Sequence, residues 1–323
     1  MHMWTGSPGA GKPAVAPLRG QRPQAHHRSP RFAPLWLLSP AGLVIAALVI
    51  APIFFLVFTS FTDFNSRTLF VGTFNFVGFG QYIATFQSAQ FWWSTLITVL
   101  FTAALVAGSV VIGVGVAQLL TRLGRVLRFS VTIVLILAWA MPNVASSQVW
   151  KFLFQPGLGV INWLLTTTGL FGNVTNLAWD NHTFLGLLCI WLLVVWQAVP
   201  FIALTTYAAQ TQLDPAYLEA ARLDGASEAR IYTTIVLNYL RPTILLVTVL
   251  SIIWDFNIFN QIWLITQGGP NNSTATLGIW TYLTAFNTFK IGTGAAISVI
   301  TTIMLLIISG FYIRNLLRSG EDL

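Results

Sequence analysis

One apolar stretch near residue 250 carries side chains whose types and spacing could bind a polar solute. Ser251, Trp254, Asp255 and Ile258 recur at intervals of three, four and seven residues, which places them on one face of a helix. An indole can cover the apolar side of a sugar ring while a hydroxyl and a carboxylate bind its hydroxyl groups. A carboxylate facing lipid costs at least about 2.5 kcal/mol, so Asp255 should face a cavity or a partner. The alternative that Trp254 and Asp255 only pack against a neighbouring helix stays open.

A second candidate wall is the segment Trp196-Gln197-Ala198-Val199-Pro200-Phe201, which lies within another apolar stretch. Pro200 lacks a backbone N–H, so a helix passing through it has a free carbonyl group and is expected to kink. We expect this segment to face the one around residue 255.

A third pattern is a charged segment between two apolar stretches, Glu219-Ala220-Ala221-Arg222-Leu223-Asp224-Gly225. Asp214 and Pro215 precede it, and this pair is typical of a helix start because Asp caps free amides and Pro suits the first helical position. Asp224-Gly225 should end that helix, and Ser227 should cap a second one that runs from Glu228 to Val236. The loop 211–236 is therefore predicted to be two short helices joined by a bend.

The elements that must position these residues are membrane spans. The chain of 323 residues is 55% hydrophobic and only 8% charged, which excludes an ordinary soluble domain. Apolar runs of the ~20 residues that cross a bilayer predict an all-α integral membrane protein with six spans in residues 35–317. The runs are Leu35–Phe58, Trp93–Leu120, Phe129–Trp150, Phe184–Tyr207, Leu245–Ile265 and Thr293–Ile313.

Basic residues predict the orientation of these spans. Thirteen of the sixteen Lys and Arg lie in the N-terminal tail, the loops after the second and fourth spans, and the C-terminal tail; Arg67, Lys151 and Lys290 lie in the other loops. By the positive-inside rule both termini and the loop 211–236 should be cytoplasmic. Residues 1–34 are predicted to be a disordered tail and residues 318–323 a short C-terminal tail. The net charge of +7 is thus explained by topology, without nucleic-acid binding.

Residues that could perform catalysis or bind metal are sparse. The four His are His2, His26, His27 and His182, and the single Cys189 lies in the fourth apolar run, where it should be a buried filler. Gly6 to Lys12 has the spacing of a phosphate-binding loop, but Pro13 replaces the hydroxyl residue that would bind Mg²⁺. We therefore expect no catalytic residues, no metal and no cofactor in this chain.

The charged segment resembles a family signature. Glu219-Ala220-Ala221, Gly225, Ile235 and Leu237 match the EAA motif of permease subunits of binding-protein-dependent ABC importers, although Asn238 stands where the signature has Pro. The stretches Gln267-Gly268-Gly269-Pro270 and Trp150–Gly159 resemble elements of the carbohydrate-uptake branch. The chain is thus similar to this family from its first span to its C-terminus.

The resemblance implies a six-span permease in a bacterial or archaeal cell membrane. It implies partners: a second, related permease, two ATPase subunits that bind ATP and Mg, and an extracytoplasmic solute-binding protein. The residues implied to contact the ATPase are Glu219, Ala220, Ala221, Asp224 and Gly225. Similarity to the maltose permease implies that Ala198, Phe201, Ser251, Trp254, Asp255 and Ile258 line the pathway, with Trp196 beside them. Ile258 is apolar where that relative has an amide, so the pairing permease can share or carry the site.

Two other functions are weighed against sugar import. A secondary transporter would usually show inverted repeats or several intramembrane charges, whereas Asp255 is the only acidic residue well inside a predicted span. An importer of glycerol 3-phosphate would share the motifs, but the fourth and fifth predicted spans contain no Lys or Arg to hold a phosphate. These points favour a neutral saccharide over a small anion.

Overall fold

The computed structural model describes residues 33–321, and their regular structure is helical apart from one isolated bridge between Thr62 and Phe76. The described residues fall into two units that divide between Pro52 and Ile53. Residues 1–32 of the predicted disordered tail, which include the stretch with the spacing of a phosphate-binding loop, lie outside the described residues. A continuous helix spans Leu38–Thr59, where the first span was predicted. This span comprises most of α1 (Ala33–Ile45), all of the π-helical turn η1 (Ala46–Ile50) and all of α2 (Ala51–Thr59).

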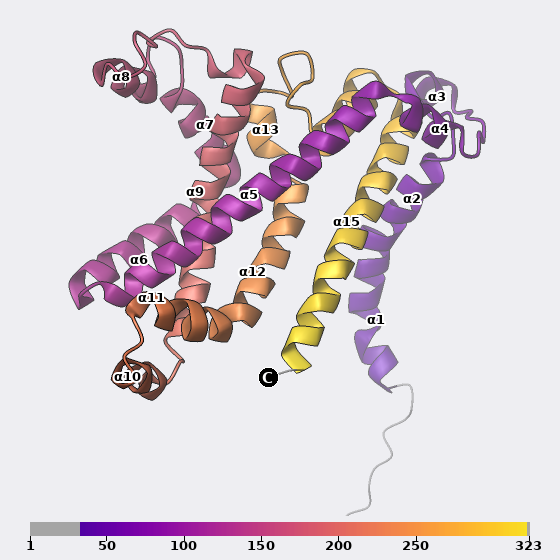
Figure 1. The fold of residues 1–323 in the computed structure, drawn as a ribbon. Helices are drawn as coiled ribbons and strands as arrows, with labels where there is room; N and C mark the ends of the chain where they lie inside the picture. Colours follow the sequence, from indigo (N-terminus) through magenta and orange to yellow (C-terminus); the bar gives the residue numbers. More distant parts are fainter. Residues whose placement is uncertain (1–32, 322–323) are drawn as a thin grey trace, which may run out of the picture. The chain divides into compact units, whose positions relative to one another are not determined.

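The second and fourth predicted spans form the central pair of the larger unit, α5 (Ala89–Arg122) and α9 (Thr183–Gln210), which pack side by side (Figure 1). Gly113 on α5 permits this contact, because a Cβ there would lie 2.6 Å from the Ile202 side chain on α9. Helix α9 continues through Pro200. Two short helices, α3 (Ser66–Val71) and α4 (Gly80–Gln87), precede α5.

The third predicted span, Phe129–Trp150, is not a single helix. It consists of α6 (Arg125–Ala140) and α7 (Asn143–Leu153), which meet at an angle of 101° (Figure 1). Pro142 explains the break, because it lacks an N–H donor and disfavours helical geometry at the preceding residue; Met141 accordingly has φ −69° and ψ 129°. The chain then forms α8 (Val160–Thr167) and the 3₁₀ turn η2 (Trp179–Asn181) before α9.

Both predicted boundaries of the fifth span, Leu245 and Ile265, differ from those in the structure. A continuous helix runs from Glu228 to Phe256, formed by α11 (Glu228–Ile231), the π-helical turn η3 (Tyr232–Val236) and α12 (Leu237–Phe256). After Phe256 the chain leaves the helix at Asn257 and starts α13 (Asn260–Ile265). The second helix of the charged loop is therefore the beginning of this long helix. The loop's first helix, α10 (Pro215–Leu223), precedes it.

The last elements are α14 (Leu277–Tyr282), the π-helical turn η4 (Leu283–Asn287) and α15 (Ile291–Glu321), which contains the sixth predicted span and extends into the predicted C-terminal tail. The larger buried cluster joins α9 to α5 and α13 and includes Cys189, which is free and buried. Within the described residues, five helices are long and apolar enough to cross a membrane, and the bent α6–α7 pair makes a sixth span if it counts as one. The six-span membrane fold is therefore confirmed, with the third span broken.

Candidate functional site

The charged segment forms the predicted helix at one end of the larger unit (Figure 1). Asp214 caps α10 by accepting a hydrogen bond of 2.9 Å from the Ala216 amide, and Pro215 occupies the first turn. Glu219 and Ala220 are exposed, and Ala221 is half-buried. The segment therefore presents an exposed helical face, as a docking element must.

The bend after α10 depends on Gly225. Asp224 ends the helix, and Gly225 has φ +79°, a left-handed conformation that glycine adopts without strain. The amide of Ala226 donates back to the Ala221 carbonyl at 3.0 Å, which closes the end of the helix. The bend predicted at Asp224-Gly225 is confirmed.

One ion pair holds the two sides of the bend together. The Arg222 guanidinium on α10 contacts both carboxylate oxygens of Glu228 on α11, at 2.7 and 3.4 Å. This hydrogen bond raises the pKa of Arg222 above its ordinary value. Because both side chains are exposed, the pair fixes the geometry of the bend more than it stabilises the fold.

The base of α10 is anchored to the membrane helices by apolar contacts. Leu218 packs against a buried cluster of Leu213, Val236 and Leu240. Val236 and Leu240 belong to the helix that continues to Phe256, a rod of 29 residues or about 43 Å at the helical rise. These contacts join α10 directly to this rod. Asn238 leaves the rod continuous, and its side-chain amide donates to the Thr234 carbonyl at 2.6 Å.

A cavity of about 540 Å³ lies where two helices are broken, at the α6–α7 bend and at the end of α12. Broken helices free backbone polar groups, which membranes tolerate where the chain lines a polar cavity. One such group is the Ile253 carbonyl, which accepts from the Asn257 side-chain amide at 3.0 Å. The cavity is lined by residues of α6, α7, α9, α12, α13 and the link between the last two: Trp139, Asn143, Val194, Gln197, Ala198, Phe201, Ile253, Trp254, Asp255, Asn257, Ile258, Phe259, Asn260 and Gln261.

Aromatic rings from three helices line one part of this cavity. Trp139 stacks near Phe201 with ring centroids 6.1 Å apart, and Phe201 meets Trp254 edge-on at 5.3 Å. The indoles of Trp139 and Trp254 remain 57% and 52% exposed. Their free surface can cover the apolar face of a sugar ring.

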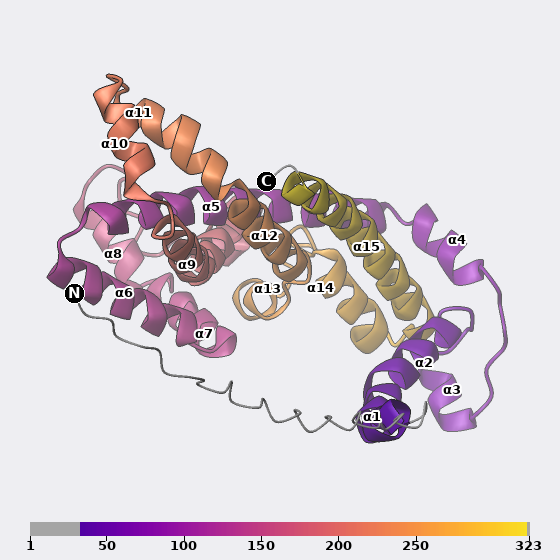
Figure 2. The ribbon, with the colours of Figure 1, turned by 90° about the horizontal axis from the view of Figure 1, so that it is seen from below.

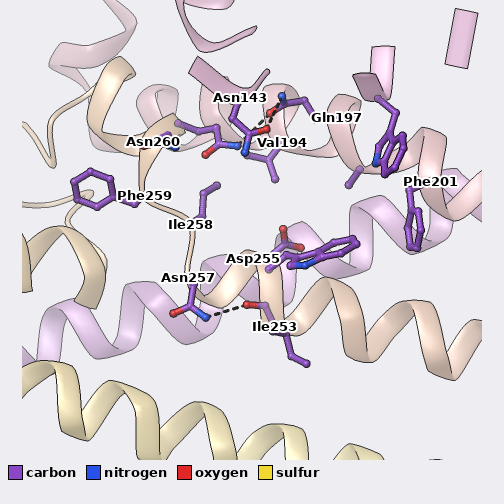
Figure 3. Close-up of a pocket in the computed structure, with 14 residues that line it drawn as sticks. Asn143, Val194, Gln197, Phe201, Ile253, Asp255, Asn257, Ile258, Phe259 and Asn260 are labelled. Atoms are coloured by element: carbon purple, nitrogen blue, oxygen red, sulfur yellow. Dashed lines mark hydrogen bonds between the residues drawn. The ribbon is translucent and has the colours of Figure 1, made fainter. Parts of the chain in front are cut away.

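Polar groups complete the cavity. Asp255 is only 6% exposed, and its Oδ2 atom has no hydrogen-bond partner among the described residues. Figure 3 shows Asn143 and Gln197 together across the cavity from Asp255. The Gln197 amide donates to Asn143 at 3.2 Å, and Gln261 donates to Gln197 at 3.2 Å, so three amides from α7, α9 and α13 form a chain. Amides and a carboxylate offer both donors and acceptors to a hydroxyl-rich solute.

Five of the seven predicted pathway residues line this cavity, and the other two lie outside its lining. Ala198, Phe201, Trp254, Asp255 and Ile258 line the cavity. Trp196 does not, because it packs with Trp150 at 5.9 Å in the apolar core. Ser251 is buried outside the cavity lining.

The expected helical face was wrong in its C-terminal part. Because α12 ends at Phe256, Ile258 is not on the same helix as Asp255. Ile258 still reaches the cavity, since the extended link after Asn257 turns back towards α9 (Figure 3).

Sequence reasoning missed Trp139 and the amide residues. A usable signal existed: Asn257, Asn260 and Gln261 put three amides within five positions of a segment predicted to cross lipid. Such density of polar side chains is unfavourable in an unbroken span and indicates a helix break that lines a cavity. Pro142 gave the equivalent signal in the third span.

Comparison with known proteins identifies the family. Residues 109–320 match the family described as binding-protein-dependent transport system inner membrane component. The chain belongs to this family. It is therefore a membrane permease component of an ABC importer, rather than an enzyme or a secondary transporter.

Several members of the family match over nearly the whole permease. The diacetylchitobiose uptake system permease protein DasB of Streptomyces coelicolor is 36% identical over 94% of this chain and 92% of its own length. The trehalose/maltose transport system permease protein MalF of Thermococcus litoralis is 28% identical over 86% of this chain and 91% of its own length.

A solved structure supports the fold of the permease. A chain of a bacterial ABC transporter involved in the import of the acidic polysaccharide alginate matches with a TM-score of 0.77. The match covers 89% of this chain and 97% of that chain at 19% identity. At this identity the likeness shows the membrane-subunit fold.

Proposed function

We propose that the permease forms the translocation pathway for a small neutral oligosaccharide. The observation that carries this proposal is the cavity at the two helix breaks, where the indoles of Trp139 and Trp254 face polar amides and the unpartnered Asp255 oxygen. The named cargo of the relative DasB, diacetylchitobiose, is an uncharged disaccharide and supports the proposal.

The charge of the cavity argues against anionic cargo. Among the described residues that line it, Asp255 is the one charged group and none is lysine or arginine. A phosphate or uronate would meet a buried carboxylate with no cation to offset the repulsion. The glycerol 3-phosphate alternative is therefore disfavoured, and the acidic polysaccharide alginate named for the similar structure would require a different lining.

Direct binding to the purified importer complex tests the proposal. Isothermal titration should show that diacetylchitobiose binds and that an acidic alginate oligosaccharide does not. Trp254→Ala and Asp255→Asn should each weaken binding of the neutral sugar by about ten-fold, the size expected for one lost ring contact or one charged hydrogen bond. Ser251→Ala is the matched control on the same helix, because Ser251 is buried outside the cavity lining. Equal affinity for both oligosaccharides, or equal losses in all three variants, would contradict the assignment.

The coupling role is assigned to α10. In this proposal Glu219, Ala220, Ala221, Asp224 and Gly225 dock in a partner ATPase on the cytoplasmic side, and ATP and Mg bind to that subunit. Support comes from the exposed face of α10 and its apolar anchor on the Glu228–Phe256 rod. ATP-driven closure of the ATPases then moves the rod and, through it, the cavity wall at Trp254 and Asp255.

The proposed complex contains two different permeases, two ATPase subunits and an extracytoplasmic solute-binding protein. The cytoplasmic placement of both termini rests on the distribution of Lys and Arg. Reconstitution with the ATPase and the binding protein but without a second permease should give no concentrative uptake. Robust uptake in that mixture would show that one kind of permease is sufficient.

A further inference from the structure

A second cavity, of about 420 Å³, lies at one end of the membrane helices. This is the end beside α10, which is called the coupling segment below because of its proposed role. Its walls come from the C-terminal ends of α5 and α9, the start of α6, and the α10–α11 bend. Figure 2 shows these elements close together in the view from below. Because α5 ends and α6 begins beside it, the cavity lies at one end of the apolar helices, where headgroups meet a membrane span.

The cavity has an excess of positive charge. Arg122, Arg128 and Arg222 line it together with one acidic residue, Glu228. Arg222 is paired with Glu228, and this is the one salt bridge within the described part of the chain. Arg122 and Arg128 form no salt bridge within the described part of the chain. The pKa of Glu228 is lowered by its hydrogen bond with Arg222 and, to a smaller extent, by the charges of Arg222 and Arg122. Three arginines and one glutamate leave the cavity with an excess of two positive charges.

The Arg128 guanidinium contacts two neighbouring groups, but one of its N–H donors has no hydrogen-bond acceptor. Its Nη2 atom donates to the Leu123 carbonyl at 2.8 Å, and its Cζ atom lies 5.9 Å from the centre of the Tyr207 ring. Its Nε atom is buried and has no hydrogen-bond partner among the described residues. A buried charged donor without an acceptor is unfavourable, which points to a ligand that accepts hydrogen bonds.

A further unpaired polar atom lies in the same cavity. Gln210 donates to Gln118 at 2.7 Å, while its own Oε1 atom is buried without a partner. A carbonyl oxygen can accept from a hydroxyl of a protonated phosphate or of a glycerol headgroup. The cavity thus offers cationic donors and one acceptor.

We propose that this cavity binds a phosphate-type oxyanion through Arg122 and Arg128. Guanidinium groups match the planar oxygen pairs of phosphate, and basic cavities between membrane helices at the cytoplasmic surface suit anionic headgroups. A bound anion would join the α5–α6 turn to the α10–α11 bend, because Arg222 and Glu228 line the same cavity. The ligand would therefore act on the position of the coupling segment, independently of the transported solute.

Thermal unfolding of the full-length permease tests this site with two probes. Inorganic phosphate is titrated against chloride at equal ionic strength in detergent, and nanodiscs of phosphatidylglycerol are compared with nanodiscs of phosphatidylcholine. The melting temperature should rise with phosphate if the ligand is a free anion, and with phosphatidylglycerol alone if it is a lipid headgroup. Losing one arginine should weaken the effective affinity about five-fold, the equivalent of about 1 kcal/mol per basic residue near the surface.

Variants separate this cavity from general surface charge. Arg122→Gln should abolish the rise in melting temperature that the ligand causes. Arg125→Gln also removes one positive charge beside the α5–α6 connection, but from a residue outside the cavity lining, so this variant should keep the rise. The Arg122 side chain forms no hydrogen bond within the described part of the chain, so its replacement should not impair folding. Arg128→Lys keeps the charge but loses the guanidinium fork, and should weaken the response. The proposal is overturned if neither probe stabilises the protein, or if Arg122→Gln and Arg125→Gln respond alike.

Discussion

Replacing Gly225 should weaken both sugar-stimulated ATP hydrolysis and transport through backbone strain alone. Gly225 has φ +79° at the end of α10, and a Cβ placed there would meet no atom within 4 Å. No steric clash therefore accompanies a substitution, and only the left-handed conformation is penalised. For a branched residue this penalty is about 1–2 kcal/mol, so the population with the native bend should fall about five- to thirty-fold relative to alternatives. We expect Gly225→Val to reduce sugar-stimulated ATPase activity and uptake in that range.

The assay compares uptake and sugar-stimulated ATP hydrolysis in vesicles containing the complete importer. Gly225→Asn is the matched control, because asparagine adopts the left-handed conformation more readily than other residues with a side chain. It adds a polar side chain at the same exposed position but should keep most of the coupling. Equal defects in the Val and Asn variants would show that the surface of Gly225, and not its bend, is what the ATPase requires. Normal coupling in both would show that the bend has no role.

Three further predictions concern packing and polar contacts. Gly113→Leu should lower the melting temperature, because its Cβ would lie 2.6 Å from Ile202 and overpacking costs about 1–3 kcal/mol. Gly115→Leu is the control and should leave the melting temperature unchanged, because a Cβ there meets nothing within 4 Å. Equal shifts in the two variants would refute the α5–α9 contact. Asn162→Leu should destabilise the segment between α7 and α9, as measured by limited proteolysis, since it removes the acceptor of the Trp179 indole N–H at 2.6 Å; unchanged proteolysis would contradict this. Hydrogen bonds from Asn75 lower the pKa of Asp63. The contact should therefore stabilise the loop that contains Asp63 at pH values above the unfolded pKa of about 3.9, and this stabilisation should be lost as the pH falls through the folded pKa. Hydrogen exchange of this loop that is independent of pH over this range, after correction for the intrinsic rate, would contradict the prediction.

The elements predicted best from the sequence are those defined by local interactions. Asp214, Pro215 and Gly225 each act within a few residues, so the start and the end of α10 follow from residue type. The long spans were predicted for the same reason, because hydropathy over about 20 residues requires no knowledge of neighbouring helices.

The cavity could be predicted only in part because it depends on where helices break. Extending a helical period across residue 257 placed Ser251 and Ile258 on one face, whereas the helix ends at Phe256 and Ser251 lies outside the cavity lining. Trp139 and Gln197 come from helices remote in sequence, and their meeting with Asp255 depends on the 101° bend at Pro142. Tertiary packing decided which aromatic side chains remained free, so Trp254 faces the cavity while Trp196 packs in the core.

The π-helical turn η3 sets the helical phase between the coupling segment and the cavity. A π turn accommodates one residue more than a regular turn and is what a single-residue insertion into a helix produces. Because one residue corresponds to about 100° of rotation, the extra residue between Tyr232 and Val236 determines which direction Asp255 faces relative to α10. Two permeases with identical motifs and cavity residues could therefore present different faces to their cargo if only one had this turn. The turn is thus a place where one inserted or deleted residue can alter solute selectivity while every named contact residue is unchanged.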